Sequence, residues 1–107
     1  MPSSDRPVLE TIAVMTAASL ERCELDAREH MLVRLAALVA ADAPPLSYLA
    51  NAGVAGDAGV DVEDVQNILV AIAPIVGSAR VVSAAGNITR ALGFAIAVAE
   101  ADLAGGD

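Results

Sequence analysis

Alanine is the feature of this sequence that most constrains its fold. The chain of 107 residues contains 24 Ala, but only one Phe, one Tyr and no Trp. Alanine has the highest helix propensity of all residues, and its small side chain lets helices pack closely. Because aromatic residues are nearly absent, each element buries little area. We therefore expect an all-α fold, in one domain covering residues 1–107, that hides its apolar surface over many helix faces.

The charge of the chain restricts its partners and its location. It has 14 acidic residues against 6 Arg and no Lys, a formal net charge of -8. No basic patch can replace the counterions of a nucleic acid or an anionic membrane. The apolar runs are shorter than the roughly 18–20 residues that cross a bilayer. These two features lead us to expect no nucleic-acid or membrane partner. The single Cys cannot form an internal disulfide, so we expect a cytoplasmic protein.

Glycine and proline divide the chain into five expected helices and no strand. Ser4 or Asp5 can cap the first helix, and Asp26 followed by Glu29 resembles a capping box for the second. Asp61 is a good cap for the fourth, and Pro74 predicts a kink or an early end in it. The expected helices cover residues 7–23, 27–41, 46–54, 62 onwards and 79–103.

The last expected helix is too apolar for a lone subunit to bury. Small residues recur on one face of it, at Gly86, Gly93 and Ala97, and Ala79 and Ser83 extend this stripe. Residues 91–99 are apolar on every side, apart from the glycine, which predicts burial all round. A chain of this size cannot supply that burial, so we expect a homo-oligomer with closed symmetry.

A set of polar residues in apolar surroundings gives the candidate ligand site. Arginines in an acidic protein must find an acid, a cluster of carbonyls or an anionic ligand. Two alternatives are open for Arg80 and Arg90: an Asp or Glu partner, in the chain or across an interface, or a small carboxylate ligand. The candidate ligand-binding residues are Ser47, Tyr48, Asn51, Arg80, Asn87 and His30.

Other reactive residues give weaker signals. His30 could be a general base, since its unperturbed pKa lies near neutrality, or a surface or interface histidine. Cys23 has no second cysteine to resolve an oxidised form, so a catalytic role is not expected. One His and one Cys make no zinc set, and the acids at 61, 63 and 64 are best explained as a solvated helix start. No phosphate-binding or nucleophile-elbow motif appears, and we expect no metal and no cofactor.

Three segments together resemble a known family. They are REHMLVRLAALVA, AGVDVEDVQNILVAIAPIVGSAR and the long helix that follows. Their order, a helix starting near R-E, a helix–turn with A-G-V-x-x-E-D-V and a glycine break, resembles the carboxymuconolactone decarboxylase and alkylhydroperoxidase-like superfamily over residues 28–97. The resemblance implies an alkylhydroperoxidase-like all-α fold and a trimer, hexamer or related ring.

The resemblance also identifies what this chain lacks. Peroxidase members carry a C-x-x-C pair and a following His. One placement of the motif puts these three positions at Ala41, Pro44 and Tyr48, and another puts them at Pro44, Ser47 and Asn51. Neither supplies a Cys or a His, so a dithiol peroxidase mechanism is disfavoured.

Two functions remain open from the resemblance. The first is an oligomer that binds a small carboxylate or acts as a lyase, with Tyr48 or His30 as proton donor and Arg80 as carboxylate anchor. The second is a redox-silent structural or regulatory homo-oligomer without catalysis. The first predicts a concave pocket in which Arg80 has no acid partner. The second predicts polar side chains that are all satisfied within the protein.

Overall fold

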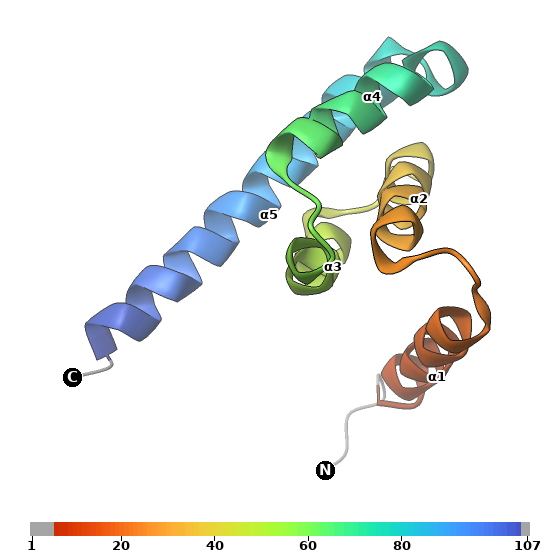
Figure 1. Ribbon diagram of the computed structural model, residues 1–107. Helices are drawn as coiled ribbons and strands as arrows, with labels where there is room; N and C mark the ends of the chain where they lie inside the picture. Colours follow the sequence, from red (N-terminus) through yellow and green to blue (C-terminus); the bar gives the residue numbers. More distant parts are fainter. Residues whose placement is uncertain (1–5, 106–107) are drawn as a thin grey trace.

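The computed structural model describes the backbone of residues 6–105 and the side chains of residues 6–93, and it is all-α. Five helices follow one another, as the sequence predicted, and the described residues contain no strand (Figure 1). The expected caps at Ser4 and Asp5 lie outside the described residues. The helices are α1 (Arg6–Arg22), α2 (Ala27–Ala40), α3 (Pro45–Asp57), α4 (Val62–Val76) and α5 (Ser78–Gly105).

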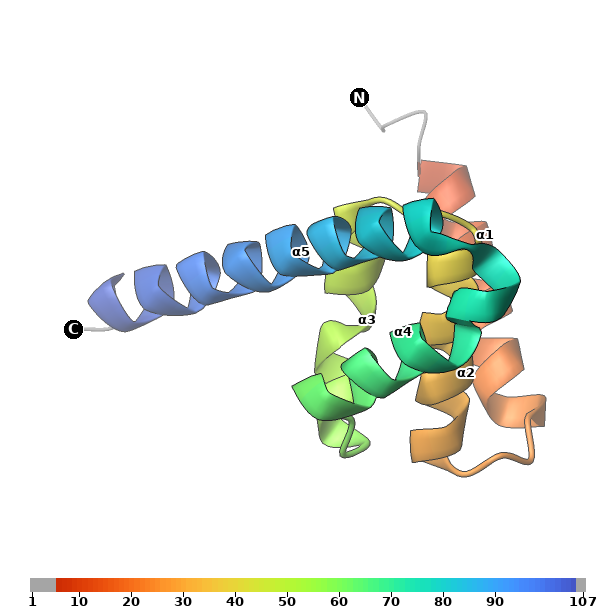
Figure 2. The same ribbon diagram turned by 90° about the horizontal axis from the view of Figure 1, so that it is seen from above.

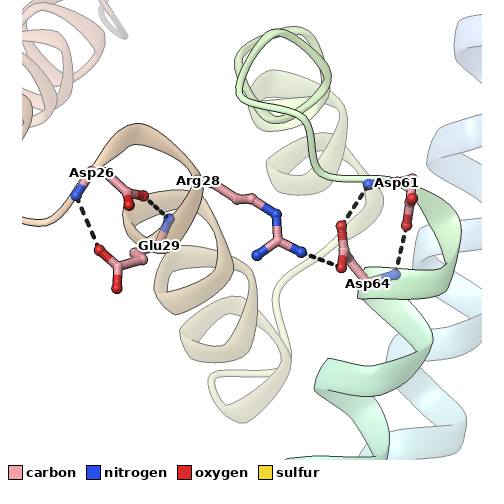
Figure 3. A network of polar contacts seen from close by, with 5 residues as sticks. All are labelled: Asp26, Arg28, Glu29, Asp61 and Asp64. Carbon is pink, nitrogen blue, oxygen red and sulfur yellow. Dashed lines mark hydrogen bonds and ion pairs between the residues drawn. The ribbon is translucent and has the colours of Figure 1, made fainter.

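Capping boxes begin both α2 and α4 (Figure 3). The sequence predicted the box of α2, and for α4 it predicted Asp61 as the cap. The Asp26 carboxylate accepts from the backbone N–H of Glu29 at 2.8 Å, and Asp61 does the same for Asp64. Each pair satisfies backbone donors that a helix start leaves free. Arg28 of α2 donates to the Asp64 carboxylate, so the two helix starts are joined by an ion pair.

The core lies around α2, which contacts α3, α4 and α5. Met31 and Val39 of α2 are each only 1% exposed. Ala84 and Ala91 of α5 belong to the same buried cluster, and Ile88 of α5 is partly buried against it. The remaining buried hydrophobic residues are Leu35, Ala43, Tyr48 and Ala55.

Pro74 lies in the last turn of α4, which ends two residues later at Val76. The missing proline N–H removes one helical hydrogen bond. Because α4 ends two residues later, few helical hydrogen bonds follow the proline. Gly77 follows with φ 88°, a conformation that residues with a Cβ rarely adopt, and the chain then enters α5. This turn brings α5 back alongside α4 (Figure 2).

The first and last helices extend away from the other three. No residue of α1 is buried, and the helix lies to one side of the packed helices (Figure 1). The C-terminal part of α5 reaches beyond the other helices in both views (Figures 1 and 2). The radius of gyration is 15.3 Å, against about 13 Å for a typical compact domain of this length. Among the described helices, none combines the length and apolarity that a membrane crossing requires.

Candidate functional site

The described residues form an apolar cavity of about 540 Å³ among α2, α3, α4 and α5. Its volume lies within the range of small-molecule sites, roughly 300–1,000 Å³. Leu35 comes from α2, Tyr48 and Ala55 from α3, Leu69 from α4 and Ile88 from α5. The few lining residues with polar side chains besides tyrosine are Asp61, Gln66 and Thr89. A cavity of this kind favours an apolar ligand.

Tyr48 lines this cavity and carries its most unusual polar group. The residue is 5% exposed, and its hydroxyl is buried without a hydrogen-bond partner among the described residues. Burial raises the pKa of this hydroxyl above the ordinary value of 10.0, and the negative charge of Asp42 raises it further. Tyr48 therefore keeps its proton at neutral pH and has a hydrogen bond left to donate.

A second polar cluster lies outside the cavity lining, where Asp42 contacts polar side chains of α5. It follows α2 in the left-handed conformation, with φ 55°, which Asp tolerates better than most residues. Its carboxylate accepts from the Ser83 hydroxyl at 2.8 Å and lies 3.6 Å from Nη1 of Arg80. Arg80 thus has an acid partner in its own chain, the arrangement predicted for a structural arginine.

The amide side chains of the candidate site bind backbone carbonyls. Nδ2 of Asn51 donates to the carbonyl of Ser47 at 2.8 Å, one turn earlier in α3. Nδ2 of Asn87 donates to the carbonyl of Ala43 at 3.2 Å, which joins α5 to the connection between α2 and α3. Neither amide lines the cavity, and Ser47 does not line it either. Of the six candidate ligand residues, the structure places Tyr48 alone at the cavity wall.

His30 is buried in α2, where it is 6% exposed, rather than lying on the surface of the subunit. Nη1 of Arg34 lies 3.4 Å from its Nε2, one helical turn away. The guanidinium can donate this hydrogen bond when Nε2 is the unprotonated ring nitrogen. His30 does not line the cavity, so the described geometry gives it a packing role.

Neither Cys23 nor the acidic residues form a reactive cluster. Cys23 is a free, half-buried thiol just after α1. Asp61 and Asp64 are engaged in the capping box of α4, and Asp64 also binds Arg28. Among the residues that the structure describes, no group of three or more His, Cys, Asp or Glu could hold a metal ion.

The sequence reasoning missed both the cavity and the role of Asp42. In the sequence, Asp42-Ala-Pro-Pro indicates only a helix break, because Pro44 and Pro45 disfavour a continuing helix. The residue type could have indicated a turn at Asp42, because Asp is one of the residues that adopt a left-handed backbone conformation. The cavity could not be found in this way, because it depends on how four helices pack.

No protein-family model, curated protein or solved structure matches this chain. The resemblance to the carboxymuconolactone decarboxylase and alkylhydroperoxidase-like superfamily therefore stays a prediction.

Proposed function

We propose that this protein binds a small, mainly apolar molecule in the cavity between α2, α3, α4 and α5. The observation that carries the proposal is the cavity itself, with a volume of about 540 Å³ and walls made mainly of Val, Leu, Ile and Ala. Apolar lining favours an apolar ligand body because burial removes its surface from water, at about 25 cal/mol per Å². A few polar groups in such a site fix the orientation of the ligand.

Tyr48 contributes its ring to the cavity wall, while its hydroxyl is shielded from solvent and has no partner within the described residues. The ligand is therefore expected to contact Tyr48 through apolar surface. A ligand held through a carboxylate is less well supported, because Arg80 is placed against Asp42 and not in the cavity lining.

This binding role is compatible with the carboxymuconolactone decarboxylase-like character expected from the sequence, which stays a prediction. A dithiol peroxidase stays disfavoured, because Cys23 is the single cysteine of the chain and no second thiol can resolve it.

Exposed apolar side chains support self-association as a second part of the proposal. In α1, Leu9 is 64% exposed and Met15 65%, and no residue of the helix is buried. Large exposed apolar surfaces mark interaction sites. A homo-oligomer that covered this surface is also what the purely structural alternative requires.

Two glycines of α3 provide a matched test of the cavity. Gly56 lines the cavity and Gly53 does not, and a Cβ added at either position meets nothing within 4 Å. Replacing either by Leu improves helix propensity equally, by roughly 1 kcal/mol. The probe is the neutral fluorophore N-phenyl-1-naphthylamine, titrated into the full-length protein.

Gly56→Leu is expected to weaken binding of this probe about tenfold, which corresponds to roughly 1.4 kcal/mol, because the new side chain occupies cavity volume. Gly53→Leu is expected to leave the dissociation constant within about twofold of the wild type. Equal affinities for the two variants, or no probe binding by the wild type, would contradict the proposal.

A further inference from the structure

We infer that the cavity selects an apolar amine, a ligand with a cationic head group, over a neutral or anionic ligand of the same shape. The inference rests on the proposed ligand binding and names the chemical class of that ligand. Asp61, at the start of α4, is the residue that makes the selection. The apolar body of the ligand lies among the aliphatic side chains, and its ammonium group lies beside the Asp61 carboxylate.

The first step is the charge of the cavity wall. Among the described residues, Asp61 is the one charged residue that lines the cavity, and no arginine lines it. Tyr48 keeps its proton at neutral pH and adds no charge. A bound ligand therefore faces one negative charge and no positive charge. An ammonium group is attracted by that charge, and a carboxylate is repelled by it.

The second step is the position of Asp61 where the cavity opens to solvent. Asp61 is exposed although it lines the cavity, and so are Gln66 and Thr89. These polar side chains therefore lie at the mouth of the cavity and not in its interior. A charged head group that binds at the mouth keeps part of its hydration. It thereby avoids most of the cost of burying a charge among apolar side chains.

The third step is that the polar groups at the mouth offer hydrogen-bond acceptors. One carboxylate oxygen of Asp61 accepts from the backbone N–H of Asp64 at 2.8 Å, and the other has no partner within the described residues. Oγ1 of Thr89 donates to the carbonyl of Ala85 at 2.8 Å, which leaves its lone pairs to accept. An ammonium group carries only N–H donors, so it matches these acceptors. A carboxylate carries only acceptors and does not match them.

The fourth step is that neighbouring charges do not cancel the charge of Asp61. Arg28 donates to Asp64 and not to Asp61 (Figure 3). These two carboxylates and one guanidinium sum to a single negative charge. The backbone at a helix start attracts anions, but Asp61 already caps α4, and Glu63 and Asp64 lie in its first turn. This end of the cavity is therefore negative.

Three naphthalene probes of nearly the same size test this inference with the full-length protein at neutral pH. They are 1-naphthylmethylamine, 1-naphthalenemethanol and 1-naphthoate, which are cationic, neutral and anionic. Equilibrium dialysis gives each dissociation constant, and naphthalene fluorescence is readable because the chain has one Tyr and no Trp. Because an exposed ion pair is weak, we expect the amine to bind about fourfold more tightly than the alcohol. The naphthoate is expected to bind about fourfold more weakly than the alcohol.

Two substitutions separate the local charge of Asp61 from the overall charge of the protein. Asp61→Asn removes the charge and keeps the cap, because Asn caps a helix as well as Asp does. This variant is expected to bind the amine and the alcohol with dissociation constants within about 1.5-fold of each other. Glu21→Gln is the matched control, since it changes the net charge equally at an exposed position of α1. It is expected to keep the wild-type preference, and equal loss in both variants would refute the role of Asp61.

The outcomes also separate this inference from the proposed function. Failure of all three probes to bind would overturn this inference, and failure of N-phenyl-1-naphthylamine as well would overturn the proposed function. Binding of the alcohol without any preference for the amine would overturn this inference alone. Binding of the amine that Gly56→Leu does not weaken would do the same, because the amine would then lie outside the cavity.

If Asp61→Asn does not fold, the salt dependence of the wild type decides. Dissolved ions screen an exposed charge, so the ratio of the two dissociation constants should approach one between about 50 and 500 mM salt. The affinity for the neutral alcohol serves as the internal control in the same titrations. A preference for the amine that salt leaves unchanged would refute the contact with Asp61.

Discussion

Replacing Tyr48 by Phe removes a single oxygen, the buried hydroxyl that has no partner among the described residues. The ring that packs in the core is preserved, and Tyr48 is 5% exposed, so the shape of the cavity wall should change little. We therefore expect a more stable protein, although most substitutions in a core are destabilising.

The magnitude follows from the cost of burying an unpaired donor. That cost is about 1–3 kcal/mol, and replacing a polar group by an apolar one of the same shape recovers part of it. We expect Tyr48→Phe to raise the free energy of unfolding by about 1 kcal/mol. For a domain of this size, that gain corresponds to a melting temperature higher by roughly 4–8 °C. Both proteins must be compared at the same protomer concentration, because self-association also raises the melting temperature.

The pH dependence gives an independent readout of the same hydroxyl. The pKa of Tyr48 is raised in the folded protein, so the folded state holds this proton more tightly than the unfolded state. The resulting stabilisation is present below the ordinary pKa of 10.0 and is lost as the pH rises through the folded pKa. Wild type should therefore lose more stability than Tyr48→Phe above about pH 10.

Two measurements test this reasoning. Tyr48 is the single tyrosine of the chain, so absorbance of the phenolate reports its ionisation alone. Urea unfolding at neutral and alkaline pH gives the two free energies. A tyrosine midpoint at or below 10, or a Phe variant less stable by about 1 kcal/mol, would show that the hydroxyl is satisfied in solution.

Two further substitutions test the fold, both by urea unfolding. Asp61→Ala removes the side chain that accepts from the backbone N–H of Asp64, and it is expected to cost about 1 kcal/mol; an unchanged midpoint would contradict the capping box. Met31→Ala leaves a cavity in place of the Met31 side chain, which is 1% exposed, and it is expected to cost about 2–5 kcal/mol. Val33→Ala, in the same helix but 58% exposed, is its control and should cost less than about 0.5 kcal/mol, so equal losses would contradict the described core.

The local features of the fold could be predicted because they depend on neighbouring residues. Asp26 with Glu29, and Asp61 in front of α4, predicted helix starts, and the structure has both capping boxes. The third helix begins and ends beyond its predicted range, at Pro45 and Asp57. Its glycines at 53 and 56 did not end it, because glycine in a helix costs only about 1 kcal/mol.

The site was harder to predict because it depends on contacts between distant residues. Arg80 was expected to meet either an acid or a ligand, and the sequence could not select Asp42, which is 38 positions earlier. The sequence indicates Tyr48 through its polarity in an apolar segment, but no sequence pattern shows that its hydroxyl is buried without a partner. The sequence therefore identified reactive side chains without identifying which of them share a cavity.

The unpacked state of α1 has an evolutionary consequence. All buried side chains of the described residues lie between His30 and Ala91, so the interior of the subunit places no demand on the composition of α1. Its sequence could drift toward a fully polar helix, through Glu or Gln at Leu9 or Ile12, without a void opening inside the protein. Any selection that keeps this helix apolar must then act through whatever the helix touches outside its own polypeptide.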